Sequence, residues 1–206
     1  MFTVQVKNAS KRFHHEWIFK NLDLELSSGD TLAITGGNGS GKSTLLKCLS
    51  GAIPLTAGTI EYQAGPLQIP EEQWFRSLAL ATPYLELPEE FTLSEVINFH
   101  FQFKKPLQNR TTTEILEILG LEKHKSKAIS QFSSGMKQRV KLALAIFSEV
   151  PLLLLDEPST NLDSQGLSWY LKLIQEYSSG RILVICSNDP REYDFCGKKI
   201  AMEAFK

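Results

Sequence analysis

Several things that this chain of 206 residues lacks narrow its class. No charge sign dominates, because 22 Lys and Arg residues stand against 23 Asp and Glu residues, for a net charge of −1. No overall field would therefore recruit nucleic acid or an anionic membrane, and we expect no nucleic-acid partner. No apolar run approaches the roughly 18 residues of a membrane-spanning helix. A role at a membrane would have to run through a partner.

Cysteine is also scarce. The three cysteines, Cys48, Cys186 and Cys196, form no C-x-x-C pair and are odd in number. The four histidines show no spacing typical of a metal site. We therefore expect buried, reduced thiols in a cytosolic protein. Apolar content of 42% and charged content of 22% are ordinary for a globular domain.

A glycine-rich segment is the most informative feature that is present. It fits the phosphate-binding pattern G-x-x-x-x-G-K-[ST]. Glycines let the chain curl so that successive N–H groups point into one concavity, and a helix N-terminus adds positive potential. The residues that we expect to contact a nucleotide in this glycine loop are Gly36, Gly37, Asn38, Gly39, Ser40, Gly41, Lys42, Ser43 and Thr44.

The flanking segments supply the context that such a loop needs. Residues 31–34 are typical of a buried strand, and residues 43–49 of a helix closed by Gly51. Lys42 is expected to reach the β- and γ-phosphates, and the Ser43 hydroxyl to ligate Mg²⁺. A Gly/Ser linker that matches by chance would lack the strand and the helix. The sequence therefore predicts binding of a nucleoside triphosphate.

The chain changes pattern twice. Residues 1 to about 66 alternate apolar and polar positions, which predicts short strands with an antiparallel portion. Residues from about 84 to 132 are helical in pattern, and 133–206 return to helix–strand alternation. We expect an α/β fold: one domain over 1–206, with a mainly parallel P-loop NTPase core (1–83 and 151–206) and an inserted helical subdomain (about 84–150).

Particular elements can be placed within this outline. The expected strands cover 2–6, 22–26, 59–62, 152–155 and 182–185, and the expected helices cover 139–147 and 167–177. Thr92 with Glu95 and Thr111 with Glu114 have the spacing of capping boxes, so a helix should begin after each threonine.

Two carboxylates follow the apolar run 152–155. In open α/β sheets, ligands bind at the carboxyl edge, where Asp156 and Glu157 would lie. Asp156 is expected to hold Mg²⁺, and Glu157 to orient or deprotonate the water that attacks the γ-phosphate. A solvated turn is the ordinary alternative for such a pair, but the glycine loop favours a functional role.

A third motif, the signature segment, covers residues 133–139. Ser133, Ser134 and Gly135 open a helix there, and a helix N-terminus with a free hydroxyl suits an anion. Taken alone, Ser133 is better explained as an ordinary N-cap.

The order of these motifs resembles that of ATP-binding cassette (ABC) ATPases over essentially the whole chain. Residues 133–139 look like that family's signature motif, and 159–163 resemble its D-loop, ending at Asp163. The resemblance implies ATP as ligand and head-to-tail homodimers or heterodimers, in which the signature segment of one subunit closes on ATP in the other. It also implies a separate transmembrane permease, which would hold the protein peripherally on the cytoplasmic face of the membrane.

Departures from the family pattern bear on hydrolysis. Ser134 and Met136 replace a usual glycine and glutamine of the signature motif, and both changes are tolerable. The glutamine expected near residues 81–84 is missing, and Pro83 or a neighbour takes its place. Asn188 stands where a switch histidine is expected, and it can donate a hydrogen bond but cannot carry charge. ATP binding should survive, with hydrolysis that is slow or partner-dependent.

An aromatic side chain commonly stacks on adenine in this family. Phe13 matches by position, with Trp17 as the second candidate, although a core aromatic would have the same pattern. The helical insert is rich in aromatics, of which a subset exposed in a groove would suit a helix of a partner.

Four functional hypotheses remain. The leading one is the ATPase subunit of an ABC transporter, which powers a permease by ATP-driven dimer closure. The second is an ATP-dependent dimerisation switch with little turnover, as Pro83 and Asn188 suggest. A soluble ABC protein on ribosomes or DNA ranks lower, because no second cassette or heptad run is found. A P-loop kinase or GTPase would leave residues 133–139 and 159–163 unexplained.

Overall fold

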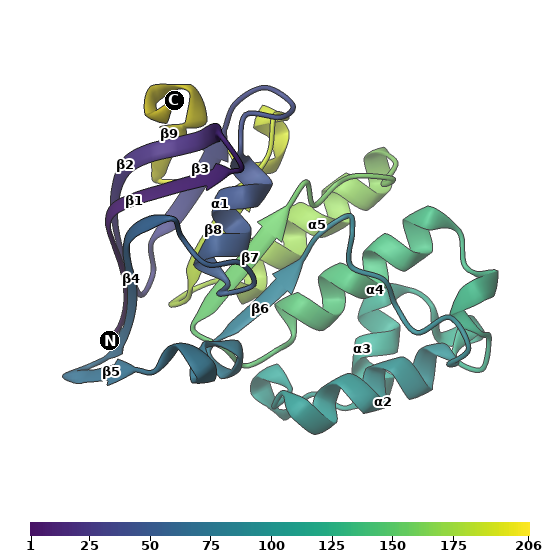
Figure 1. Cartoon of the computed structure of the whole chain (residues 1–206). Coiled ribbons are helices and arrows are strands. Elements are labelled where there is room, and N and C mark those ends of the chain that lie inside the picture. The colour runs from purple at the N-terminus through teal and green to yellow at the C-terminus, as the bar shows by residue number, and fades with distance from the viewer.

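The strands form two sheets in the structure, a computed structural model that describes residues 1–206 (Figure 1). The first sheet has the order β2-β1-β4-β5, and all its pairings are antiparallel. Its strands are β1 Phe2–Phe13, β2 Glu16–Ser27, β4 Ala57–Ala64 and β5 Leu67–Ile69. The alternation of apolar and polar residues predicted this antiparallel portion because one face of such a sheet is buried.

The second sheet is parallel throughout, with the order β6-β7-β8-β3-β9. Its strands are β3 Thr31–Thr35, β6 Leu78–Ala81, β7 Leu152–Asp156, β8 Ile182–Cys186 and β9 Lys198–Ala201. The expected mainly parallel sheet is confirmed. The edge strands β6 and β9 were not predicted, because four residues are too few for a periodic signal to stand out.

Five α-helices connect or cover the sheets. They are α1 Lys42–Leu49, α2 Leu93–Phe103, α3 Thr112–Leu119, α4 Ser134–Ile146 and α5 Ser164–Tyr177. Both capping boxes are formed, because Thr92 and Thr111 each accept from the backbone three residues on while the glutamate returns the bond. Helix α4 begins at the signature segment as predicted, with Ser133 as its N-cap, whereas the first turn of α5 was not predicted because its small polar residues carry no apolar period.

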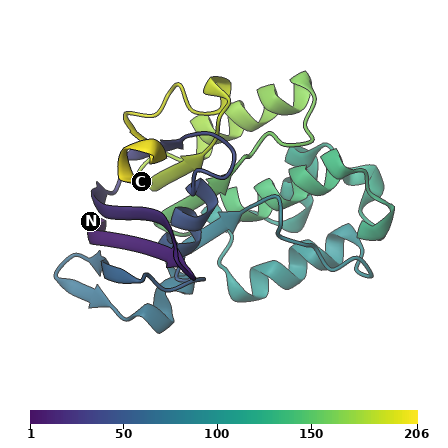
Figure 2. The ribbon, with the colours of Figure 1, turned by 45° about the horizontal axis from the view of Figure 1, so that its top comes forward.

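Alternate residues of the central strands face two different cores. Leu153 and Leu183 belong to a cluster that reaches under α2 to α5, while Leu152 and Ile182 belong to a cluster shared with α1 and the antiparallel sheet. This two-sided burial explains why strands β7 and β8 are apolar without interruption. The parallel sheet is therefore the middle layer of the molecule (Figures 1 and 2).

The helices α2, α3 and α4 follow one another between β6 and β7 and lie together on one side of the sheets (Figure 1). Lys104 at the end of α2 donates to the carbonyl of Leu78 over 2.6 Å and also to that of Phe75. A lysine thereby ties the end of α2 to the start of β6. The division at residues 84 and 150 stays a prediction.

The thiols are all free. Cys48 and Cys186 are buried and Cys196 is half-buried. Burial raises the pKa of Cys48 and of Cys196 to about 11, which keeps both protonated at neutral pH. None of the helices combines the length and apolarity needed to cross a bilayer.

Candidate functional site

The glycine loop leaves strand β3 and enters α1 through backbone that only glycine adopts readily. Gly36, Gly39 and Gly41 have φ of 139°, 75° and 107°. At Gly36 a β-carbon would meet Ser40 Oγ at 2.6 Å, and at Gly41 it would meet the side chain of Ile18 at 2.5 Å. These close approaches explain why the loop requires glycine at these positions.

A pocket of about 510 Å³ opens at this loop. It is lined by Ile18, Asn38, Gly39, Ser40, Gly41, Lys42, Ser43, Thr44, Lys47, Tyr84 and Glu157. Lys42 is buried, and its ammonium donates to the carbonyls of Gly36 over 2.6 Å and Gly37 over 3.2 Å. The pocket thus joins the N-terminus of α1 to two lysines, as an anion requires.

Asp156 ends strand β7 beneath this pocket. The residue is 2% exposed, and its buried Oδ1 has no hydrogen-bond partner. Burial raises the pKa of Asp156, and the charge of Glu157 adds to this, while Ser43 and Lys42 oppose it. A buried oxygen without a partner beside a serine hydroxyl fits Mg²⁺, which takes one or two protein oxygens together with phosphates and water.

Glu157 follows at once and lines the pocket. Its φ of 45° is unusual for a residue with a side chain, and its N–H donates to the Cys186 carbonyl over 2.8 Å. Thr160 Oγ1 donates to Glu157 Oε2 over 3.4 Å. The turn after β7 therefore sends Asp156 into the sheet edge and Glu157 toward the open space of the pocket.

Asn188 lies beyond the end of β8, and the structure brings it to the glycine loop. Its amide Nδ2 donates to Asn38 Oδ1 over 3.1 Å, and both side chains are exposed. The neighbouring parallel strands β3 and β8 explain this meeting, because their carboxyl ends share one edge of the sheet.

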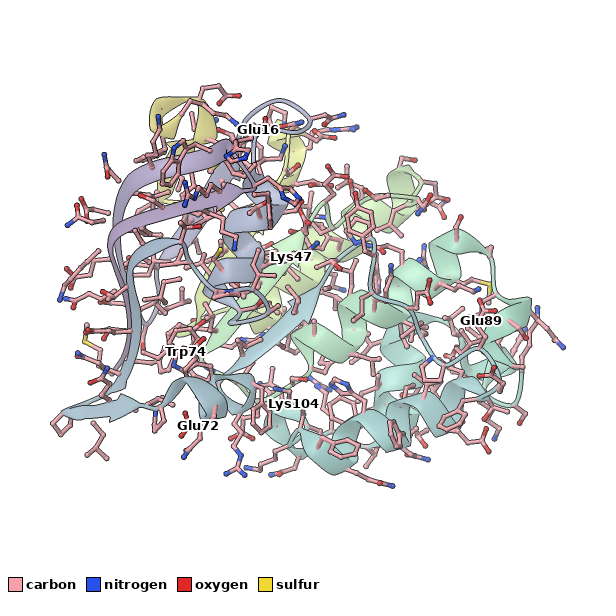
Figure 3. The ribbon with its side chains drawn as sticks, in the orientation of Figure 1. Glu16, Lys47, Glu72, Trp74, Glu89 and Lys104 are labelled. Carbon is pink, nitrogen blue, oxygen red and sulfur yellow. The ribbon has the colours of Figure 1, made fainter.

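Tyr84 is a pocket residue that the sequence did not single out. It lies three residues after β6, is 75% exposed and lines the pocket with Lys47, whose ammonium is 5.6 Å from the ring centroid. Figure 3 shows Lys47 on α1, on the side facing the segment that leaves β6. Among residues 81–84, where a glutamine was expected, Tyr84 rather than Pro83 lines the pocket.

Lys141 of α4 holds the backbone that carries Tyr84. This lysine is 8% exposed and donates to the carbonyls of Thr82 over 3.1 Å and Pro83 over 3.2 Å. Burial lowers the pKa of the Lys141 ammonium. Helix α4, which the signature segment opens, and the loop after β6 are therefore joined by the buried ammonium of Lys141.

The signature segment forms a second helix end, at the start of α4. Ser133 is the N-cap of α4, and its Oγ accepts from the Met136 N–H over 3.2 Å, so the capping role expected for this serine is confirmed. Asp163 caps α5 by accepting from the Gly166 N–H over 2.7 Å. A pocket of about 360 Å³ is lined by Ser133, Ser134, Gly135, Met136, Arg139, Asn161, Leu162 and Asp163.

The aromatic candidates for adenine lie at the hairpin between β1 and β2. Phe13 is 46% exposed with the Lys11 ammonium 4.9 Å from its ring, and Trp17 is 38% exposed beside Arg12. Ile18, one residue after Trp17, is the nearest of this group to the phosphate end, because it lines the pocket itself. Stacking by Phe13 stays a prediction.

Comparison with known proteins places the chain. The model of the family described as "ABC transporter" matches residues 19–160. The chain belongs to this family. It is 30% identical over 186 residues to an uncharacterised ABC transporter ATP-binding protein of Bacillus subtilis, covering 90% of this chain and 85% of the relative. A cytochrome c biogenesis ATP-binding export protein of Vibrio cholerae is 30% identical over 166 residues, with 80% of each covered.

A solved structure supports the same fold. A dimeric ATP-binding cassette in a post-hydrolysis state with ADP and Pi has a TM-score of 0.82, at 23% identity, and covers 96% of this chain and 93% of that one. The chain is thus a single-cassette nucleotide-binding domain with the P-loop NTPase fold. Members of the family bind ATP and generally hydrolyse it, and they work with transmembrane subunits.

Proposed function

We propose that this protein is the ATP-hydrolysing subunit of an ABC transporter and drives a separate transmembrane permease by closing head-to-tail on a second cassette. One observation carries the hydrolytic part: Lys42, Ser43 and Glu157 line one pocket at the sheet edge, and the buried carboxyl group of Asp156 lies beside Ser43. A nucleotide that only stabilised the fold would need the lysine but no carboxylate on the far side of its phosphates.

Each of these groups takes a distinct role. Lys42 and the N–H groups of the loop hold the β- and γ-phosphates, and Ser43 with Asp156 holds Mg²⁺. An Mg²⁺ ion held by these two residues would neutralise negative charge on the phosphates. Glu157 accepts a proton from the attacking water, and Asn188 donates a hydrogen bond to the γ-phosphate.

The second helix end supports the dimer. The N-terminus of α4 exposes Ser133 and Ser134 beside a pocket that contains Arg139 but no residue of the glycine loop. A phosphate bound at Lys42 therefore completes its shell with the α4 end of another copy or of a related cassette. Homodimers and heterodimers both fit this arrangement.

Aromatic side chains on α2 and just before it support docking of a permease. Phe91, Phe99 and Phe103 are 36%, 45% and 73% exposed and pack edge to face in a row, with ring centroids 5.8 and 5.1 Å apart. Such a row along α2 and the segment before it suits an apolar helix of a membrane partner, which would keep the cassette at the cytoplasmic face of the membrane.

The test measures both ATP hydrolysis and association with a membrane protein. ATP turnover and nucleotide binding are measured for the wild type and for Glu157→Gln, and the tagged wild type is purified from detergent-solubilised membranes. We expect turnover that is lost in Glu157→Gln with ATP affinity retained, and co-purification of a polytopic membrane protein. Recovery of soluble partners alone would overturn the transporter role.

A dimerisation switch is the second candidate. Pro83, where a glutamine was expected, and Asn188, where a histidine was expected, favour it, and the amide of Asn188 cannot carry a proton as histidine does. ATP-induced dimers with no turnover, in the presence or absence of membranes, would decide for the switch.

A further inference from the structure

The last residues of the chain contact strand β3 and the glycine loop that follows it. Strand β9 pairs with β3, so that Ile200 lies beside Ile34 and Ala201 beside Thr35. Thr35 Oγ1 donates to the Ile200 carbonyl over 3.2 Å. The turn η6, Met202–Phe205, follows directly and lies against β2 (Figures 1 and 2).

Two neighbouring residues of η6 reach opposite ends of the loop. Met202 is fully buried, and its methyl carbon lies 3.5 Å from the position that a β-carbon on Gly41 would take. Glu203 reaches the other end, where its Oε1 accepts from the Gly37 N–H over 2.9 Å. Because Met202 is fixed in the core, Glu203 is presented to the loop from an anchored turn.

The bond from Glu203 acts on one peptide unit, the one that joins Gly36 to Gly37. The N–H of this peptide donates to Glu203 and its carbonyl accepts from Lys42 over 2.6 Å. Glycine on both sides makes rotation of the peptide cheap. Rotation would break both bonds at once, so the carboxylate on one side stabilises the lysine contact on the other.

The charge of Glu203 fits this role. The Gly37 N–H lowers the pKa of the Glu203 carboxyl most, and the Lys42 ammonium lowers it further. The carboxylate is outside the pocket, whose lining begins at Asn38. It therefore acts behind the loop rather than on the phosphates.

We propose that Glu203 is a positioning residue, which holds the Gly36–Gly37 peptide in the orientation that keeps Lys42 ready for the phosphates. This rests on the proposed function for its catalytic consequence. Loss of the bond should cost nucleotide affinity, because the loop must then be ordered when the nucleotide binds.

The experiment compares Glu203→Ala, Glu203→Gln and Glu203→Asp with a matched control, Glu16→Ala. Glu16 is an exposed carboxylate at the start of β2 that makes no hydrogen bond or ion pair (Figure 3). Binding of trinitrophenyl-ATP, competition by ATP, KM and kcat are measured, with the melting temperature as a check on folding. The amide proton of Gly37 is followed by NMR without nucleotide.

We expect Glu203→Ala to weaken ATP binding and raise KM about threefold to tenfold with kcat nearly unchanged. Glutamine keeps an acceptor oxygen at the same reach and should recover part of the affinity, whereas aspartate is too short. The Gly37 amide proton should move upfield in the alanine variant, because it loses a charged acceptor. The control should match the wild type.

Two results would overturn the proposal: an unchanged Gly37 amide proton in Glu203→Ala, or an ATP affinity equal to that of Glu16→Ala. A general folding defect would show as a lowered melting temperature with kcat and KM both altered, which also contradicts a positioning role. If the wild type bound no ATP, the proposed function would fail, while the NMR measurement would still test the contact.

Discussion

Two helix ends in this molecule are the proposed sites for phosphate, and they differ in what surrounds them. The N-terminus of α1 is enclosed by Lys42, Lys47 and Glu157 of the same chain. The pocket at the N-terminus of α4 contains one cation, Arg139, and one carboxylate, Asp163, and the Ser133 hydroxyl already accepts a capping hydrogen bond. Under the proposed function, the α1 end would supply its half of the phosphate site within this chain, and the α4 end would supply the other half to a second cassette.

The difference lies in where each end gets its neighbours. The loop before α1 is supported from three strands, since β3 carries it, β8 brings Asn188 and β9 leads to Glu203. Near the α4 end the contacts are fewer: Lys137 donates to Glu89 Oε1 over 2.5 Å, and Gln138 donates to the Pro158 carbonyl over 2.8 Å. The first end should therefore set nucleotide affinity and the second should set the response to a second cassette.

The largest effect should follow from Lys42→Met, which removes the cation but keeps most of the stem. Turnover should fall by at least about 100-fold, because a fixed positive group no longer meets the transferring phosphate. ATP affinity should fall with it. Initial rates and titration with trinitrophenyl-ATP check this, with the exposed Lys7→Met as the control. Turnover within threefold of the wild type would contradict the assignment.

The α4 end can be tested without damage to the helix. Ser133→Asp keeps an N-cap acceptor but sets a negative charge against an incoming triphosphate, whereas Ser133→Ala loses the cap at a cost of about 1 kcal/mol. We expect Asp to lower turnover about tenfold or more and Ala to lower it less, although Asp should be the more stable variant. Binding of ATP to the monomer should not change. Parallel loss of activity and stability would instead indicate a capping role alone.

A smaller effect should follow from removal of the Tyr84 hydroxyl. Tyr84→Phe keeps the ring against Lys47 and should lower kcat about threefold, while Tyr84→Ala should lower it more. A single-turnover assay measures the chemical step directly. Exposed Phe75 offers a matched control, since Phe75→Ala removes an aromatic of similar exposure away from the pocket. If both alanine variants behave alike, the ring has no role in the pocket.

Acid should weaken the helical side of the molecule. Burial lowers the pKa of His100 to about 4, with the charge of Lys104 as a second cause, and its Nε2 pairs with Ser148 Oγ at 2.9 Å. In the unfolded chain the His100 imidazole takes up a proton below about pH 6.5, whereas in the folded chain it does so only near pH 4. Stability should therefore fall by roughly 2–3 kcal/mol as pH drops through that window.

Urea unfolding between pH 4 and 7 measures this loss. His100→Gln should flatten the profile, because glutamine can still meet Ser148 but does not titrate. His15→Gln, at an exposed site, should leave the slope unchanged. A slope that persists in His100→Gln would assign the titration to another group.

Local signals in the sequence were sufficient for much of the fold. The glycine loop, both capping boxes and the apolar strands β7 and β8 follow from neighbouring residues whose preferences agree. Contacts over long separations were not predictable. Glu203 meets Gly37 across 166 positions, and Lys141 meets Thr82 across 59. Only the pairing of strands decides which of many exposed glutamates and lysines finds such a partner.

Tyr84 shows the same limit at the site itself. Its residue type gave no hint of phosphate chemistry, and in the sequence it is one of several aromatics near the helical insert. Tyr84 reaches the pocket because it lies three residues past β6, and this edge strand ends beside β7 and hence near Glu157. The roles assigned to Asn188, Phe13 and the signature residues stay predictions.

Lys141 connects the loop after β6 rigidly to helix α4. Its ammonium donates to the two consecutive carbonyls just before Tyr84, and α4 begins seven residues before Lys141, at its exposed N-terminus. If Tyr84 moved when a triphosphate bound, these hydrogen bonds would transmit the movement to the whole 13-residue helix α4. Under the proposed function, occupancy of the nucleotide pocket would thus tilt the end of α4 that is expected to meet the second cassette.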